Sequence, residues 1–397
     1  MRVIRKDIAT VVLGCAFMAV CSATAVGTAD SEWATYHGDR GLCGTSDSEL
    51  PRNPRQIWSF KAGSAVRATP VVGDNRVYFA AEKGRVCALD LKGNKLWSAA
   101  PRVTEKTAEG QTTDKPEEFL APAVYIASTV VLGSLNGFVY AFEAATGELR
   151  WKHEAGERIQ GTVNWTGDGG PGGLRVIVVL QPSGTVQALH IGSGVKKWER
   201  EGAARCDGSP SVGAGRIVFG SCDAGLHVLN AQDGAELDFI KLGAGKEIAG
   251  GVALRGETAF TGNRSGSLIR IDVPGQKEVW SNAEAEGTEL FTTPAIREQR
   301  VVFAANNGYV YCVEAGTGKT IWKHETGGSD AGSPVIAQNK VVASAGGKLF
   351  VLTLDSGTLI WSHEVSDEIS GPAVAHGMIV VGTGDGRVVA FGEGQAE

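Results

Sequence analysis

A short pattern recurs through most of this 397-residue chain and constrains its fold more than any other feature. The pattern is a glycine followed by a run of small and apolar residues, as in Gly84-Arg85-Val86-Cys87-Ala88-Leu89. Successive copies are 53, 47, 41, 41, 42, 39 and 39 residues apart. A period near about 40 residues is typical of a ring or array of small structural units. The eight copies begin at Gly84, Gly137, Gly184, Gly225, Gly266, Gly308, Gly347 and Gly386.

An aromatic residue closes each of the first seven units. The eighth unit stops at Phe391 without a closing aromatic, but Gln56-Ile57-Trp58-Ser59-Phe60 near the N-terminus supplies one. A strand around Trp58 that completes the last unit would close a ring and leave no long unpaired edge. The closing residues are therefore Trp58, Trp97, Trp151, Trp198, Phe239, Trp280, Trp322 and Trp361.

Each unit has the pattern of four short strands. In the first unit we expect strands over 68–72, 76–81, 85–91 and 95–98, separated by turns that contain Gly and Asn. Proline recurs where the first strand of a unit begins, a position that loses no ladder donor. The sequence thus predicts an all-β fold: an eight-bladed β-propeller of four-stranded antiparallel blades, closed by the N-terminal strand around Trp58.

The N-terminus has the features of an export signal. Arg2, Arg5 and Lys6 are positively charged, residues 8–20 are apolar, and Ala23-Thr24-Ala25 offers small residues for cleavage. The apolar run is short for a transmembrane helix, which needs about 20 residues.

We therefore expect a signal peptide over residues 1–25, a lead-in segment over 26–55 and one propeller domain over 56–397. No other long apolar stretch follows, so the mature chain is expected to have no transmembrane span. It is also expected to be a monomer. The predicted location is the periplasm or cell envelope. A lipid anchor is weakly supported, because the apolar stretch before Cys15 in Val12-Leu13-Gly14-Cys15 is short.

Cleavage after Ala25 leaves five of the seven cysteines, so at least one thiol is unpaired. Cys206 and Cys222 flank a predicted hairpin turn at Ala214-Gly215. A disulfide is feasible if they lie opposite each other, whereas a shift of one residue places them on opposite faces of the sheet. Both alternatives stay open at this point.

The end of each unit resembles a known family. Glu314-Ala315-Gly316-Thr317-Gly318-Lys319-Thr320-Ile321-Trp322 is similar to the blade signature Ala-x-Asp-x-x-Thr-Gly-x-x-x-Trp of the PQQ-like repeat family, and residues 143–151 and 355–361 follow it too. The resemblance covers about residues 33–391. It implies that each closing aromatic packs on the next blade near a glycine of a tight turn. Phe239, which replaces Trp in the fourth unit, is expected to fill its site less completely.

The family implies two kinds of function. One branch, the quinoprotein alcohol dehydrogenases, binds pyrroloquinoline quinone (PQQ) and Ca²⁺ in the central channel, often beneath a disulfide between adjacent cysteines. This sequence has no Cys-Cys pair and no acidic spacing that demands a metal. The other branch contains non-enzymatic BamB-like propellers of the outer-membrane β-barrel assembly machinery, which hold a partner protein through loops on one face.

The leading interpretation is a non-enzymatic, exported, protein-binding scaffold of the cell envelope that needs no cofactor. Its expected partner is an envelope or outer-membrane protein. Nucleic acid is not expected, because the net charge is −6 and no basic block stands out. A PQQ-dependent dehydrogenase with PQQ and calcium is the alternative.

A third hypothesis is a small ligand or polysaccharide bound where the first strands of all blades converge, at the channel mouth. The interpretation that the sequence favours is that the same polar residues line a water-filled channel. The candidates by position are Arg67, Gln160, Asp207, Glu247, Thr292, Asp330 and Ser370.

Two insertions interrupt the period, and loops outside regular blades often carry function. Residues 101–118 are polar and charged, and residues 165–173 are rich in glycine. Trp165 is interpreted either as a binding anchor on a loop or as a cap on the blade beneath it. His37, the single histidine of the lead-in segment, is interpreted as structural or exposed rather than catalytic.

Overall fold

The structure is a computed structural model that describes residues 32–106, 112–167, 175–179, 183–202 and 204–394. The expected signal peptide (1–25), Cys15 and most of the glycine-rich insertion lie outside these ranges. Within them, no helix has the length and apolar character needed to cross a membrane.

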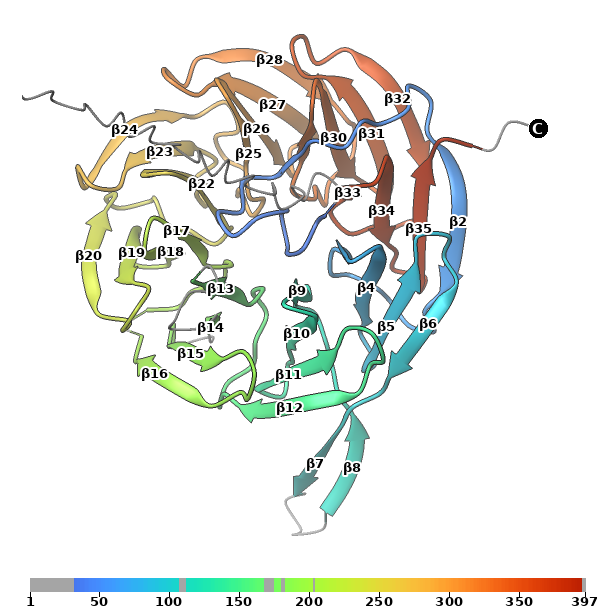
Figure 1. Cartoon of the computed structure of the whole chain (residues 1–397). Helices are drawn as coiled ribbons and strands as arrows, with labels where there is room; N and C mark the ends of the chain where they lie inside the picture. Colours follow the sequence, from blue (N-terminus) through green and yellow to red (C-terminus); the bar gives the residue numbers. More distant parts are fainter. Residues whose placement is uncertain (1–31, 107–111, 168–174, 180–182, 203, 395–397) are drawn as a thin grey trace, which may run out of the picture.

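Antiparallel sheets follow one another around a central axis, with their strands stepping from the centre outwards (Figure 1). Each sheet packs its faces against its two neighbours, so the buried apolar residues form clusters between successive sheets. The all-β propeller predicted from the repeat is confirmed.

The strands of the ring group into sheets that follow the order of the chain. These sheets contain β3 (Val71–Gly73), β4 (Arg76–Ala81), β5 (Arg85–Asp90) and β6 (Lys95–Ala99); β9 (Val124–Ile126), β10 (Thr129–Gly133), β11 (Phe138–Glu143) and β12 (Leu149–Glu154); β13 (Asn164–Thr166), β14 (Arg175–Val179), β15 (Val186–His190) and β16 (Lys196–Arg200); β17 (Ser211–Gly213), β18 (Arg216–Ser221), β19 (Gly225–Asn230) and β20 (Glu236–Lys241); β21 (Val252–Arg255), β22 (Thr258–Gly262), β23 (Leu268–Asp272) and β24 (Lys277–Asn282); β25 (Ala295–Arg297), β26 (Arg300–Ala305), β27 (Tyr309–Glu314) and β28 (Thr320–Glu325); β1 (Thr45–Ser46), β29 (Val335–Ala337), β30 (Lys340–Ala345), β31 (Lys348–Thr353) and β32 (Leu359–Glu364); and β33 (Ala373–Ala375), β34 (Met378–Gly382), β35 (Arg387–Gly392) and β2 (Arg55–Lys61).

The prediction of eight four-stranded blades is wrong. Among the described residues, seven sheets have four strands, and the sheet that contains β29–β32 has five. The fifth strand is β1, which comes from the lead-in segment and pairs in parallel with β29, with Thr45 opposite Ile336. It can add there because β29 is the innermost strand, and its inner edge carries unpaired backbone groups.

The ring is closed as the position of Trp58 predicts. Strand β2 pairs antiparallel with β35, from Arg55 opposite Gly392 to Lys61 opposite Arg387. The last sheet therefore has the order β2-β35-β34-β33, and the two ends of the propeller sequence share it.

The innermost strands are shorter than predicted. Strand β3 begins at Val71 rather than at residue 68, because Pro70 lacks an N–H and cannot extend the ladder. The polar insertion at 101–118 is not a plain loop but a hairpin of β7 (Arg102–Lys106) and β8 (Thr112–Pro116), which projects from the edge of the ring (Figure 1). Trp165 is not on a loop either, since it lies in β13 and packs beside the cluster that contains Ile159.

The closing tryptophans join successive sheets. The indole N–H of Trp322 donates to the carbonyl of Leu354 in the next sheet at 2.7 Å, and Trp58 donates to Leu91 across the closure at 2.9 Å. The same contact is made by Trp97 to Ala144, Trp151 to Ile191 and Trp280 to Ala315. Each of these five rings lies on a glycine turn of the next sheet, as Trp322 does on Gly357.

The fourth unit departs from this arrangement. Phe239 contacts His227 of its own sheet, with ring centroids 4.6 Å apart. The atoms nearest to a side chain placed at Gly275 in the next sheet belong to Asp272 and not to Phe239. The shorter phenyl ring therefore packs within its own sheet. An indole at this position would be long enough to reach the turn of the next sheet.

The cysteines Cys206 and Cys222 are free thiols in the structure. The backbone N–H of Cys222 donates to the carbonyl of Arg205, so Cys222 lies beside Arg205 and is out of register with Cys206. Cys206 packs in the apolar cluster with Val212 and Phe219, and burial raises its pKa to about 12. In this register the two thiols are not bonded to each other.

The docking of Trp322 on Gly357 gives a stability prediction. Gly357 has φ +66°, and an added Cβ would lie 2.5 Å from Trp322 Cε3, whereas Gly215 has φ +72° and open space around it. Gly357→Ala combines backbone strain with overpacking, and Gly215→Ala adds strain alone. We expect Gly357→Ala to lower the free energy of unfolding by about 1–3 kcal/mol more than Gly215→Ala. Urea denaturation measures both, and equal losses would contradict the docking role.

Candidate functional site at the channel mouth

The two ends of the central channel differ. The innermost strands begin at one end, which we call the mouth; it consists of the segments before these strands and the turns between second and third strands, including residues 64–69, 205–209, 264–266, 288–293 and 367–371. The opposite end holds the turns between first and second strands, including residues 74–75, 256–257 and 298–299.

A plug segment, residues 33–50, lies across the end opposite the mouth. In Figure 1 it is the blue stretch that crosses the centre of the ring. Its backbone carbonyls accept hydrogen bonds from N–H groups in or directly after the innermost strands of most sheets. The plug segment is therefore bound to most of the ring. These bonds run to the carbonyls of Trp33, Ala34, Arg40, Gly41, Cys43, Gly44 and Ser46 from the N–H groups of Val72, Tyr125, Val212, Leu254, Ile296, Ile336 and Gln338.

Two plug side chains point into the channel wall. The Tyr36 hydroxyl lies 3.0 Å from Thr293 Oγ1 and 2.6 Å from Ser333 Oγ, and burial raises its pKa. His37 is buried, with Nδ1 2.7 Å from the carbonyl oxygen of Leu42 and Nε2 2.9 Å from that of Pro334. His37 is therefore a structural residue of the plug, as one of the two interpretations of the sequence has it.

The candidates chosen from the sequence all lie in segments that precede innermost strands. Their environments differ. Thr292 and Ser370 are buried and satisfied, because Thr292 Oγ1 donates to Ala304 O at 2.7 Å and Ser370 Oγ accepts from Gly382 N at 2.9 Å. These two hydroxyls hold loops in place and are not open to a ligand. Gln160, Glu247 and Asp330 make no side-chain contact with one another in the described hydrogen bonds and ion pairs.

Asp207 is the candidate around which other groups gather. Its Oδ1 accepts from Arg205 Nε at 2.7 Å, and its Oδ2 lies 3.4 Å from Arg264 of the next sheet. Arg264 also pairs with Glu289 at 2.7 Å, and its guanidinium lies 5.4 Å from the centre of the Phe291 ring. This mouth cluster joins three successive sheets and ends in a half-exposed aromatic ring.

Arg67 belongs to a second, smaller ionic group. It pairs with Glu368 and lies 3.8 Å from Glu82. Side chains of all three are substantially exposed, so this group adds little to stability. This group lies at the mouth where the first and last sheets of the ring meet, whereas the Asp207 cluster belongs to sheets from the middle of the chain.

Sequence reasoning missed Arg205, Arg264, Glu289 and Phe291. Asn263-Arg264-Ser265 is a turn, with Asn263 Oδ1 accepting from Ser267 N at 2.8 Å. Because the sequence of this segment is explained by the turn, the functional potential of the Arg264 charge was overlooked. Because the second and third strands meet at the mouth in every sheet, scanning those turns together with the first-strand starts would have found Arg264.

In its described residues, the mouth does not have the residues of the metal site found in the dehydrogenase branch. The described residues contain no group of three or more His, Cys, Asp or Glu that could hold a metal ion. The acidic side chains Asp207, Glu289 and Glu368 are each paired with an arginine. A Ca²⁺ site needs converging and uncommitted oxygens, so these residues do not fit one.

Comparison with known proteins decides the family. The profile described as outer membrane protein assembly factor BamB matches residues 51–117, 115–248 and 240–393. The chain belongs to this family. Outer membrane protein assembly factor BamB of Burkholderia pseudomallei (strain K96243) is 32% identical over 320 residues, which are 76% of this chain and 77% of that protein.

Solved structures show how widely the BamB-like fold is shared. BamB from Moraxella catarrhalis matches with a TM-score of 0.69 and 19% identity, over 87% of this chain and 99% of that one. Quinohemoprotein alcohol dehydrogenase from Comamonas testosteroni matches with a TM-score of 0.74 and 13% identity, over 92% and 82%. At these identities the likeness concerns the fold alone. The PQQ-like resemblance seen in the repeat is confirmed.

The buried plug histidine predicts a pH dependence of stability. Burial lowers the pKa of His37 below that of a free histidine, despite the two carbonyls and Asp39 nearby. The unfolded chain then binds more protons below about pH 6.5, so the free energy of unfolding should fall as the pH drops from 7.5 to 5.

Urea denaturation at the two pH values measures this loss, and His37→Gln should reduce it. Burial lowers the pKa of His376 as well, so part of the slope should remain in the variant. An unchanged slope in His37→Gln would show that the plug histidine does not titrate with unfolding.

Proposed function

We propose that this chain is a non-enzymatic scaffold of the cell envelope that holds an envelope or outer-membrane protein at the mouth. The family to which it belongs, and several relatives named outer membrane protein assembly factor BamB, support the general role. The expected signal peptide over 1–25 and export to the periplasm belong to the same proposal.

Phe291 is the observation that carries the proposal. Among the described residues, the other large exposed apolar side chains lie on or directly beside the outermost strands, at the rim of the ring. Phe291 is 44% exposed and lies instead in the segment before β25, at the mouth. An aromatic ring beside an arginine, with charged residues around both, is the composition typical of binding hot spots.

The mouth is also suited to select its partner. Asp207, Arg264 and Glu289 present both signs of charge next to the ring of Phe291. A charged rim around an apolar contact contributes more to specificity and association rate than to affinity. Arg264 is already paired with Glu289. A partner protein that replaces Glu289 in this pair would therefore have to offer a carboxylate of its own.

A photo-crosslinking experiment tests the site directly. The full chain, with p-benzoylphenylalanine at position 291, is expressed in its native envelope and irradiated. We expect a crosslink to one envelope or outer-membrane protein, identified by mass spectrometry. The matched control carries the probe at Leu149, which is 53% exposed on β12 at the rim, and should give no such product.

Phe291→Ala measures the strength of the contact. We expect affinity for the crosslinked partner to fall at least about tenfold, since hot-spot aromatics contribute about 2 kcal/mol. Leu149→Ala should leave it unchanged. Equal affinity of Phe291→Ala and the parent chain would contradict the site. Dye reduction with alcohols after addition of PQQ and Ca²⁺ would instead support the dehydrogenase alternative.

A further inference from the structure

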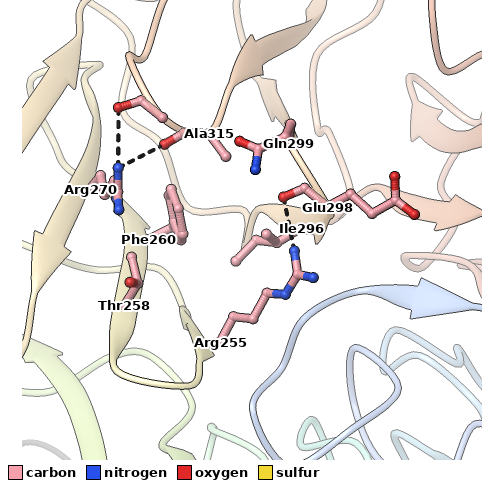
Figure 2. Close-up of a pocket in the computed structure, with 9 residues that line it drawn as sticks. Arg255, Thr258, Phe260, Arg270, Ile296, Glu298, Gln299 and Ala315 are labelled. Carbon is pink, nitrogen blue, oxygen red and sulfur yellow. Dashed lines mark hydrogen bonds between the residues drawn. The ribbon is translucent and has the colours of Figure 1, made fainter.

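A cavity lies between two neighbouring sheets at the end opposite the mouth. It has a volume of about 220 Å³ and is lined from the β21–β24 sheet and the β25–β28 sheet. Arg255 and Arg270 come from the first sheet, and Gln299 and the Ala315 turn come from the second (Figure 2). Phe260 and Ile296 form its apolar floor.

Arg270 departs from the small or apolar residues that lie opposite the other closing tryptophans. It lies in β23 opposite Trp280, the closing tryptophan of its sheet. An arginine there is placed in the packing layer between two sheets, which is costly for a charged group unless a partner compensates it. The residues opposite the other closing tryptophans are Ala88, Ala141, Ala188, Cys312, Val351 and Ala390.

The protein itself compensates Arg270 only in part. One terminal nitrogen donates to the carbonyls of Ala315 at 3.3 Å and Gly316 at 3.1 Å (Figure 2). Its Nε is buried and has no hydrogen-bond partner. Within the described part of the chain, no carboxylate lies within ion-pair distance of Arg270.

Arg255 reaches the same cavity from the end of β21. It donates to the backbone carbonyl of Glu298 at 2.9 Å, while the Glu298 carboxylate points away from the cavity (Figure 2). The described ion pairs include none for Arg255. Gln299 extends its amide towards the space between the two arginines (Figure 2).

The next cavity around the ring shows the contrast. It has a volume of about 440 Å³ and also contains two arginines. Each has an acidic partner, since Arg297 pairs with Asp47 at 2.5 Å and Arg300 lies 3.9 Å from Asp355. The cavity of Arg255 and Arg270 therefore has an excess of positive charge that this neighbouring cavity lacks, although the Nε of Arg300 is, like that of Arg270, buried without a hydrogen-bond partner.

We propose that this cavity is an oxyanion-binding site, in which Arg270 and Arg255 hold a carboxylate or a phosphate with the help of the Gln299 amide. Guanidinium groups form strong, directional hydrogen bonds with both anions. The volume admits one such group on a short stem, supplied either by an acidic side chain of a partner or by a small free anion. The site lies at the other end of the ring from Phe291, so it is independent of the partner contact proposed above.

Titration calorimetry on the full chain tests the site with two probes. Inorganic phosphate represents a free phosphate, and N-acetylglutamate represents an acidic side chain. We expect one equivalent of at least one probe to bind per chain, and the stronger probe identifies the source.

Arg270→Ala is the decisive variant, because it restores the residue that several other sheets have at this position and should fold. We expect it to weaken binding at least about tenfold, as the loss of charge-assisted hydrogen bonds requires. Arg300→Gln, in the neighbouring cavity, is the matched control and should bind like the parent chain.

Two results would overturn the proposal. One is the absence of saturable binding of either probe to the parent chain. The other is binding by Arg270→Ala equal to that of the parent, with both proteins folded by circular dichroism. The melting temperature without anion gives a further check, since removal of an uncompensated charge should leave it equal or raise it in Arg270→Ala.

Discussion

The contact between a closing tryptophan and the glycine turn of the next sheet is the interaction on which the ring depends. Each sheet is hydrophobic on both faces and cannot bury them alone, so the energy of folding lies in the seams between sheets. A glycine such as Gly357 lets the indole of Trp322 lie directly on the backbone, and the indole N–H satisfies a carbonyl that the seam would otherwise leave buried. Trp58 makes the same contact across the closure, which turns an open array into a ring.

The plug segment makes the two ends of this ring unlike. Its carbonyls satisfy the inner edges of strands that would otherwise face the channel, and Tyr36 and His37 fill the space between them. One end therefore presents a continuous backbone surface, while the other presents loops with Asp207, Arg264 and Phe291. In the proposed function a partner protein binds at the mouth, whereas the arginine cavity lies at the plugged end.

Periodicity was enough to predict the fold, and single positions were not enough to predict the site. The glycine spacing and Trp58 predicted the propeller and its closure, because these features repeat and errors at one copy do not change the pattern. The fifth strand β1 was missed, since two residues of lead-in sequence carry no strand signal until an unpaired edge is available to them. Asp207 was a candidate from its position in the sequence, but its partners Arg205 and Arg264 lie 2 and 57 positions away, and Arg264 meets it only across adjacent sheets.

The sequence by itself determined that the chain forms sheets in a closed ring and that the outermost strand of each sheet carries an aromatic residue. These properties follow from local alternation and from the spacing of Gly and Trp, which any fold of this chain must satisfy. The tertiary structure decided which charged side chains have an ion-pair partner and which have none. Arg270 and Arg297 are both strand arginines, yet Arg297 pairs with Asp47 of the plug segment and Arg270 contacts only backbone carbonyls. Ion pairing depends on distances between segments that lie far apart in the chain, which no single stretch of sequence encodes.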